Sequence, residues 1–341
     1  MPTTRQVLFA SRPTGPVVPG NFSFGTAETP PLGDGDVLVR HIYMSVDPYM
    51  RGMMNGAVAY AAGFEPGRPM YGRVIGEVTE SRNPAFPEGA FVYGMLDWAE
   101  WSVAKGGESL RIVDGSRAPL SYYLGALGFP GLTAYVGMTV LATPKAGEQV
   151  FVSAAAGAVG QIAGQLARIA GAHVVGSAGS DEKLRFITAE CGFHDGFNYK
   201  LVPSVLEALR LHCPRGIDVC FENVGGATLD AVLAHANTFA RLSLCGMISQ
   251  YNALDPYHVR HLNDIISKRL SIHGFVVRDH AHLIDRYIDE MSGYIADGLV
   301  AVAEDISHGL DAAPAAFIGM MRGDNFGKQL VQVGTDPFRP D

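Results

Sequence analysis

The chain has 341 residues, of which 48% are hydrophobic and 18% charged, and this composition excludes a mainly disordered protein. Its 34 acidic side chains outnumber the 26 Lys and Arg residues, and the formal charge of -8 disfavours binding to nucleic acid or to an acidic membrane. No apolar run reaches the roughly 18 residues of a membrane span, and the first residues lack the apolar segment of a signal peptide, so we expect a cytoplasmic protein.

Up to about residue 120, the sequence predicts a β domain. Short β-type runs at 37–43, 73–78 and 90–94 are separated by turn residues rich in Gly, Pro and Asn. Runs of this kind are typical of strands that pair with close neighbours along the chain. We therefore expect an irregular, largely antiparallel sheet in this part of the protein.

From about residue 121, compact apolar strands alternate with helical patterns, which indicates βαβ units around a parallel sheet. The expected strands are 149–154, 173–177, 217–221, 240–245 and 270–277, followed by a helix at 281–298. A last β-type run at 327–333 is expected to rejoin the first domain. We predict an α/β chain in which a doubly wound Rossmann domain, residues 123–305, is inserted into a mainly β domain, residues 1–122 plus 306–341.

The segment 153–160, Ser-Ala-Ala-Ala-Gly-Ala-Val-Gly, follows a predicted strand and opens an amphipathic helix. On the GxGxxG pattern, Ala155 replaces the first glycine, while Gly157 and Gly160 keep the other two. A glycine at the middle position lets the backbone approach a pyrophosphate, and the last one lets helix and strand pack closely. Glycines also serve plain tight turns, but the strand, turn and helix context indicates dinucleotide binding.

The segment after the second strand, residues 176–180, reads Gly-Ser-Ala-Gly-Ser and lacks the acid that holds the ribose 2'-hydroxyl of NAD. Asp181 and Glu182 are better explained as the first turn of a helix behind an N-cap at Ser180. Small residues followed by Lys183 leave room and positive charge for a 2'-phosphate, so we infer NADP(H) rather than NAD(H). The alternative for Lys183 is an ordinary solvated lysine.

The cysteines and histidines do not indicate a metal site. The four cysteines show no CxxC spacing and are interpreted as free, mostly buried thiols. The pairs His258 with His261 and His280 with His282 lack a nearby Cys or clustered carboxylate, so we interpret them as solvated or capping histidines.

Seven segments together resemble one family, in the order in which that family carries them. They are residues 44–51, 154–160, 179–183, 198–200, 222–226, 245–252 and 324–328. The chain resembles the zinc-independent medium-chain dehydrogenase/reductases over nearly its whole length, and within them the prostaglandin reductase, 2-alkenal reductase and curcumin reductase group. The resemblance implies a homodimer with a GroES-like catalytic domain, which reduces the carbon-carbon double bond of α,β-unsaturated ketones or aldehydes with NADPH.

The resemblance also implies a set of cofactor contacts. These are Gly157, Ala158, Val159 and Gly160 at the pyrophosphate, Ser180, Lys183 and Tyr199 near the adenosine phosphate, and Asn223, Cys245, Gly246, Ile248, Ser249, Tyr251, Phe275, Val276, Val277 and Asn325 along the rest of the dinucleotide. Zinc-containing members of the superfamily carry a Cys ligand shortly before an Asp, and then a Gly-His-Glu segment. Here Met44 and Arg73 stand in the matching stretches, and neither side chain can replace a thiolate or an imidazole on zinc.

Without zinc, a hydrogen-bond donor must stabilise the charge that reaches the carbonyl oxygen when hydride adds to the β-carbon of an enone. Tyr251 is the first candidate for this catalytic role, because it lies just beyond the fourth strand of the cofactor domain and its phenol can donate. The alternative is a packed loop aromatic.

Tyr49, Met53 and Tyr257 are the expected substrate contacts. Met50, Met53 and Met54 either give an adaptable apolar wall or pack in the core. Apolar runs at 53–63 and 252–257 favour bulky, hydrophobic enones. Two other functions stay open on the sequence: NADPH-dependent quinone reduction, and a redox sensor that binds NADPH without turnover.

Overall fold

The computed structural model describes residues 2–56, 62–107 and 110–339. The chain divides into two compact units, Met1–Gly125 with Glu304–Asp341 and, between these segments, Ala126–Ala303. The first unit is mainly β and the second is a doubly wound α/β domain, so the predicted fold class is confirmed. Within the described residues, no helix combines the length and the apolar character needed to cross a membrane.

Unit 1 is built on a mixed sheet whose described strands follow the order β14-β15-β3-β4-β5-β7, with β6 also paired to β3. These strands are β3 (Val37–Ser45), β4 (Tyr71–Ser81), β5 (Phe91–Asp97), β6 (Trp101–Ala104), β7 (Arg111–Ile112), β14 (Glu304–His308) and β15 (Lys328–Gln332). A separate antiparallel pair joins β1 (Thr3–Phe9) to β2 (Phe22–Glu28), and the helices are α1 (Met50–Met53) and α9 (Ala313–Arg322). Because β15 pairs antiparallel with β3, a strand from the C-terminal segment joins the sheet formed by β3 to β7.

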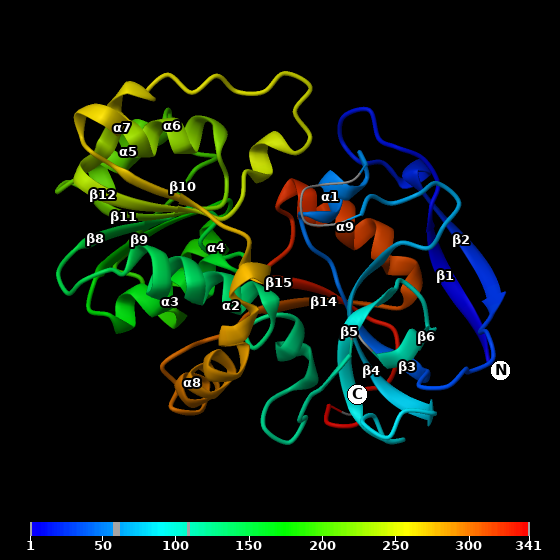
Figure 1. Ribbon diagram of the computed structural model, residues 1–341. Helices are drawn as coiled ribbons and strands as arrows, with labels where there is room; N and C mark the ends of the chain where they lie inside the picture. The colour runs from blue at the N-terminus through cyan, green and yellow to red at the C-terminus, as the bar shows by residue number, and fades with distance from the viewer. Residues whose placement is uncertain (1, 57–61, 108–109, 340–341) are drawn as a thin grey trace. The chain divides into compact units, whose positions relative to one another are not determined.

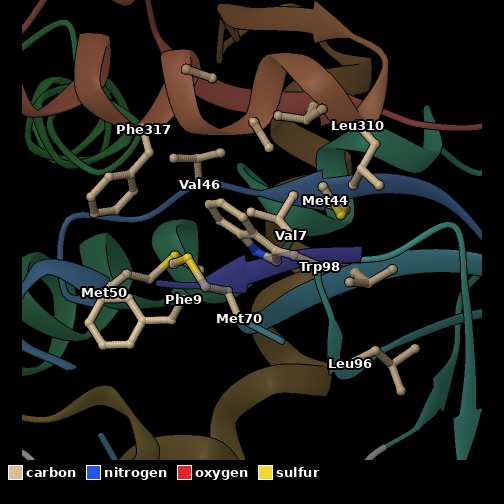
Figure 2. Packing of buried hydrophobic residues seen from close by; sticks show 14 of the residues in the cluster. Val7, Phe9, Met44, Val46, Met50, Met70, Leu96, Trp98, Leu310 and Phe317 are labelled. Atoms are coloured by element: carbon tan, nitrogen blue, oxygen red, sulfur yellow. The ribbon is translucent and has the colours of Figure 1, made fainter. Parts of the chain in front are cut away.

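The core of unit 1 explains the methionines next to Tyr49. Trp98 packs edge to face on Phe317, with ring centroids 6.4 Å apart, and Met50 lies in the same cluster (Figure 2). Met50, Met53 and Met54 are 0% exposed. The structure therefore supports the core-packing interpretation of these three methionines, and a substrate contact by Met53 stays a prediction.

Unit 2 is a parallel sheet in the order β10-β9-β8-β11-β12-β13. Its strands are β8 (Gln149–Val152), β9 (His173–Ala178), β10 (Asp195–Asn198), β11 (Ile217–Glu222), β12 (Ala236–Leu244) and β13 (Ser271–Gly274). Its longer helices are α2 (Phe129–Tyr135), α3 (Gly160–Ile169), α4 (Asp181–Arg185), α5 (Val205–His212), α6 (Gly226–His235), α7 (Asn263–Ser267) and α8 (Ile284–Ala296). Figure 1 shows α2 and α3 on one face of this sheet and α5 and α6 on the other. The chain runs outward from β8 to β10 and then returns to β11, so the strand order reverses between β8 and β11, where doubly wound folds bind their ligands.

Several strands of unit 2 differ from the prediction: β8 ends two residues earlier than expected and β12 begins four residues earlier, and β10 and β13 differ as follows. Strand β10, Asp195–Asn198, was not expected, because its sequence Asp-Gly-Phe-Asn has a single large apolar residue and no recognisable alternation. Strand β13 ends at Gly274, so residues 275–277 lie beyond the sheet instead of continuing it. Strand pairing, rather than local sequence, decides both boundaries.

Close packing and capping explain two of the helices around the cofactor edge. In α3, a Cβ at Gly164 would overlap the ring of Phe193, so glycine lets this helix lie directly on the sheet layer. In α4, Ser180 accepts a hydrogen bond from Lys183 N at 3.3 Å. The N-cap predicted at Ser180 is confirmed, with Asp181 and Glu182 in the first turn.

Candidate functional site

The glycine turn lies at the reversal point of the unit 2 sheet. Strand β8 ends at Val152 and α3 begins at Gly160, and Gly157 N donates to Ala154 O at 3.0 Å within the turn. A Cβ at Gly160 would clash with Ala154 O and lie 2.9 Å from Ala155 Cα. Ala158 and Val159 are partly exposed, so backbone N–H groups at this helix start can face an anion.

The two glycines of this turn have different expected roles, which two alanine variants separate. Gly160→Ala should lower the free energy of unfolding by about 1–3 kcal/mol, because the new Cβ meets rigid backbone. Gly157→Ala meets only Ala154 O, at 3.2 Å, and should leave stability within about 1 kcal/mol. Its effect should be on NADPH, with a rise of about tenfold or more in Kd, because the methyl group occupies the approach to the pyrophosphate. Urea denaturation and NADPH fluorescence titration measure the two effects, and equal losses of stability would contradict the assignment.

The predicted adenosine phosphate contacts meet at the ends of β9 and β10. Tyr199 N donates to Ala178 O at 3.1 Å, which places Tyr199 beside the β9–α4 connection. A Cβ built on Gly179 would lie 2.9 Å from Tyr199 Oη and 3.2 Å from Lys200 Cε. The structure therefore brings Tyr199 next to the start of α4, where Ser180 is the N-cap and Lys183 lies in the helix. It also adds Lys200, to which sequence reasoning gave no role although the residue lies in the segment 198–200 that resembles the family.

The loops after β11 and β12 carry most of the remaining predicted cofactor contacts. Asn223 N donates to Ser153 Oγ at 2.8 Å, and Asn223 Nδ2 donates to Ser153 O at 2.8 Å, which ties this loop to the glycine turn. Ser249 Oγ donates to Val224 O at 2.7 Å and joins the β12 loop to the β11 loop. Cys245, Gly246 and Ile248 lie on the same connection and are partly exposed.

Tyr251 follows a short 3-10 turn, Ile248–Gln250, and is half-buried. Its phenolic oxygen accepts a hydrogen bond from Met247 N at 3.3 Å and would lie 3.2 Å from a Cβ on Gly246. Because the backbone N–H is the donor in this bond, the bond does not consume the phenolic proton. The ring thus lies along the 246–247 turn, with a hydroxyl able to act as a donor.

Tyr257 has a structural role in this loop. Its hydroxyl donates to Asp230 Oδ2 at 3.0 Å, and its backbone N donates to Gln250 Oε1 at 2.8 Å. The buried Asp230 also accepts from His261 N at 2.9 Å. These bonds fasten the loop to α6, and a substrate contact by Tyr257 stays a prediction.

The last predicted cofactor residues lie in two places. Phe275 and Val276 follow β13 and are half-buried, whereas Val277 is only 4% exposed. Asn325 belongs to unit 1, where its Nδ2 donates to Gly327 O at 2.8 Å in the connection before β15.

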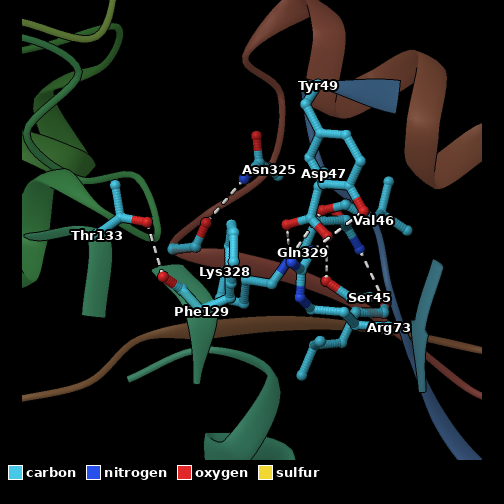
Figure 3. A network of polar contacts seen from close by, with 12 residues as sticks. Ser45, Val46, Asp47, Tyr49, Arg73, Phe129, Thr133, Asn325, Lys328 and Gln329 are labelled. Carbon is cyan, nitrogen blue, oxygen red and sulfur yellow. Dashed lines mark hydrogen bonds and ion pairs between the residues drawn. The ribbon is translucent and has the colours of Figure 1, made fainter. Parts of the chain in front are cut away.

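Unit 1 holds a buried cluster of charged groups around Tyr49 (Figure 3). Asp47 accepts from Ser45 Oγ at 2.6 Å and from Lys328 Nζ at 3.0 Å, and Lys328 also donates to Val46 O at 2.8 Å. Arg73 Nη1 donates to Tyr49 Oη at 3.1 Å. Sequence reasoning missed Lys328, because 281 residues separate it from Asp47.

Burial and charge act against each other in this cluster. Burial pushes the pKa of Asp47 up, but Lys328 and Arg73 outweigh it and hold that pKa below its ordinary value. Burial lowers the pKa of Lys328, against the opposing pull of Asp47. Burial also raises the pKa of Tyr49, so this phenol stays protonated beside the Arg73 guanidinium. The arrangement presents a neutral tyrosine next to a fixed positive charge.

The two residues that stand at the positions compared with zinc ligands, Met44 and Arg73, have other contacts. Met44 is 0% exposed in the unit 1 core, and Arg73 is bonded to Tyr49. Over the part of the chain that the structure describes, no group of three or more His, Cys, Asp or Glu residues could hold a metal ion.

Comparisons with known proteins agree on one family. Residues 5–112 match the N-terminal domain of oxidoreductase family, and residues 158–293 match the zinc-binding dehydrogenase family. The chain is 45% identical over 307 residues to a 2-alkenal reductase (NADP(+)-dependent) of Nicotiana tabacum, covering 90% of each chain. It is 41% identical over 317 residues to prostaglandin reductase 1 of Mus musculus, covering 92% of this chain and 94% of the relative.

A crystal structure of CurA from Vibrio vulnificus in complex with NADPH matches with a TM-score of 0.91 and 36% identity, covering 97% of this chain and all of that one. The second family's description names zinc, whereas the described residues contain no group of three or more His, Cys, Asp or Glu that could hold a metal ion. The chain belongs to the zinc-independent medium-chain dehydrogenase/reductases, in the group of prostaglandin, 2-alkenal and curcumin reductases, and is an oxidoreductase.

Proposed function

We propose that this protein uses NADPH to reduce the carbon-carbon double bond of α,β-unsaturated ketones or aldehydes. The observation that carries the reaction is the 45% identity, over 90% of both chains, to a protein named as an NADP-dependent 2-alkenal reductase. The site supports NADPH as the cofactor. Strand β9 ends without an acidic residue, Lys183 and Tyr199 lie next to that end, and the glycine turn lies beside the same strand end.

The residues present fit such a cofactor. The turn 157–160 would hold the pyrophosphate, and Ser180, Lys183 and Tyr199 would hold the adenosine phosphate. The Asn223 loop, the Cys245 to Tyr251 loop and Asn325 would bind the remainder of the dinucleotide. When bound, NADPH supplies the hydride.

Tyr251 is the proposed catalytic residue. Its phenol would donate a hydrogen bond to the carbonyl oxygen of the substrate, where negative charge collects during the reduction. Tyr49 is the proposed wall of the substrate site, since it is half-buried and its hydroxyl is held by Arg73. The apolar run at 252–257 is the basis of the proposed preference for bulky, hydrophobic enones. Residues 57–61 of the other expected apolar segment lie outside the described residues.

One assay tests the function against its alternatives. NADPH absorbance is followed with a trans-2-alkenal or an aryl enone, with a benzoquinone, and with no acceptor. We expect turnover with the alkenal or the enone. Turnover with the quinone alone would make the protein a quinone reductase, and tight NADPH binding without turnover on either acceptor would make it a redox sensor.

Cofactor choice is expected to depend on Lys183. Lys183→Ala should lower kcat/KM for NADPH by about tenfold or more and change kcat/KM for NADH much less, because only NADPH carries the 2'-phosphate. Lys145→Ala is the matched control, since Lys145 is an exposed lysine that precedes β8 at the opposite end of the sheet. An unchanged NADPH preference in Lys183→Ala would refute the assignment.

We also propose a homodimer in the cytoplasm. Strand β13 is the last strand of the unit 2 sheet, and its residues 271–274 are exposed or half-exposed, so a second copy can extend the sheet from there. Light scattering after gel filtration tests the dimer, and cell fractionation tests the compartment.

A further inference from the structure

We propose that Glu222 is a positioning residue, which holds the loops after β11 and β12 in the shape that binds the dinucleotide. This inference rests on the proposed NADPH site. Glu222 is the last residue of β11 and is 0% exposed, at the point where the strand order reverses. It lies in a segment that resembles the family, yet sequence reasoning gave it no role.

The first evidence is that a single residue bonds to both loops. Glu222 Oε1 accepts hydrogen bonds from Val224 N at 2.8 Å and from Gly225 N at 2.6 Å. The Glu222 backbone carbonyl accepts from Cys245 N at 2.9 Å and from Gly246 N at 3.2 Å. The side chain thus shapes the start of the β11–α6 loop, while the main chain holds the start of the loop that leads to Tyr251.

The second evidence is the conformation of the loop that the carboxylate holds. Gly225 and Gly226 have φ values of 70° and 55°, and a Cβ on Gly225 would lie 2.8 Å from Met247 Cβ. Such a turn cannot direct its N–H groups into a regular helix or strand ladder. Glu222 Oε1 accepts from two of these N–H groups, those of Val224 and Gly225. Between them and Glu222 lies Asn223, which bonds to Ser153 at the start of the glycine turn.

The third evidence is that packing in the core of unit 2 does not require a carboxylate at this position. The titratable groups facing it are the thiols of Cys220 and Cys245, and burial raises the pKa of both, so neither supplies a positive charge. Burial raises the pKa of Glu222 itself to about 7, although the Gly225 and Val224 N–H groups and Ser153 pull it down. A buried carboxylate without a cation costs stability unless its hydrogen bonds are used. Here the loop uses Oε1, while Oε2 accepts from Cys220 Sγ at 3.9 Å.

What the loop needs from this residue is an acceptor oxygen, and not a charge. Glu222→Gln keeps an oxygen that can accept from Val224 and Gly225, whereas Glu222→Met keeps the length and removes the acceptor. Val219→Ala is the matched control, because Val219 is also 0% exposed on β11 but makes none of the loop bonds described above. Ser153→Ala, which removes the acceptor of Asn223 N, serves as a second variant if the methionine variant does not fold.

Three readouts are measured on the full chain: the Kd for NADPH, the KM and kcat with a trans-2-alkenal, and hydrogen exchange of the Val224 and Gly225 amides without cofactor. We expect Glu222→Met to raise the Kd and KM for NADPH by about tenfold or more and to speed exchange at both amides. Glu222→Gln should keep the Kd, the KM and the amide exchange rates close to those of the unaltered protein. Val219→Ala should lower the melting temperature without changing these three quantities. Ser153→Ala should raise the Kd for NADPH.

Native Kd and native exchange in Glu222→Met, or an equal rise in Kd in Val219→Ala, would overturn the inference. Absence of alkenal turnover in the unaltered protein would instead refute the proposed function, and the binding and exchange readouts would still decide the role of Glu222.

A pH series adds an independent check. The pKa of Glu222 is raised in the folded protein, so the folded state holds its proton more tightly than the unfolded chain between about pH 4.5 and 7. Its contribution to stability is therefore present at low pH and is lost as the pH rises through that window. The melting temperature should fall less over this range in Glu222→Gln than in the unaltered protein, and an identical pH profile would contradict a titrating group at this position.

Discussion

Replacing Tyr251 with Phe is expected to lower kcat with an enone by about tenfold or more, because the substituted ring cannot donate a hydrogen bond to the carbonyl oxygen of the substrate. Removal of one such donor has cost about 3–4 kcal/mol in other enzymes. The variant also loses the bond from Met247 N, so the KM and Kd for NADPH must be measured beside kcat. A fall in kcat with an unchanged Kd for NADPH is the signature of the catalytic role.

Tyr257→Phe is the control for this experiment. It removes another phenolic hydroxyl from the same loop, but one whose proton is already donated to Asp230, and it keeps the ring through which Tyr257 would contact the substrate. We expect it to lower stability and to leave kcat within about threefold of the original value. Near-native turnover in Tyr251→Phe would rule out the proposed role, as would an equal loss of kcat in both variants.

Replacing Lys328 with Met is expected to lower the free energy of unfolding by about 3–5 kcal/mol, because it removes the hydrogen-bonded one of the two cations, Lys328 and Arg73, that compensate the buried Asp47 carboxylate. The same change removes one bond between β15 and the residue that follows β3, since Lys328 also donates to Val46 O. As Tyr49 lies two residues beyond Asp47, the KM for the enone should rise as well. Urea denaturation and steady-state kinetics measure these two effects.

The double variant Asp47→Asn with Lys328→Met tests whether the loss comes from the unpaired charge. It should recover part of the stability lost in Lys328→Met, since the amide is neutral. Arg322→Ala removes an exposed ion pair with Asp324 in the same unit and should change stability by less than about 1 kcal/mol. If Lys328→Met lowered the free energy of unfolding no more than Arg322→Ala does, the buried Asp47–Lys328 pair would not stabilise unit 1.

The fold class and much of the cofactor edge could be predicted because their signals are local. The apolar strands of unit 2, the N-cap at Ser180 and the glycine turn at 157–160 depend on residues within about ten positions of one another. A dinucleotide turn is also recognisable because backbone geometry allows only glycine at Gly160. These features need no knowledge of which distant segments meet.

Other features had no local signal. Strand β10 forms because it pairs with β9, although its own four residues show no strand pattern. The sequence around Met53 is compatible with a pocket wall or with a core residue, and its 0% exposure follows only from the assembled sheet of unit 1. Lys200 and Tyr199 reach Gly179 because of that same unpredicted pairing.

The sequence by itself determined the class of the protein, an α/β chain with a nucleotide turn and without the Cys and His that bind zinc, because periodicity, turn chemistry and ligand chemistry are properties of short segments. Only the tertiary structure decided which charged groups are buried together. It pairs Asp47 with Lys328 across 281 positions and sets Glu222 beneath two loops. Both outcomes depend on burial, because a buried charged group is costly unless another group compensates it. Which groups are buried is decided only when distant strands pack together.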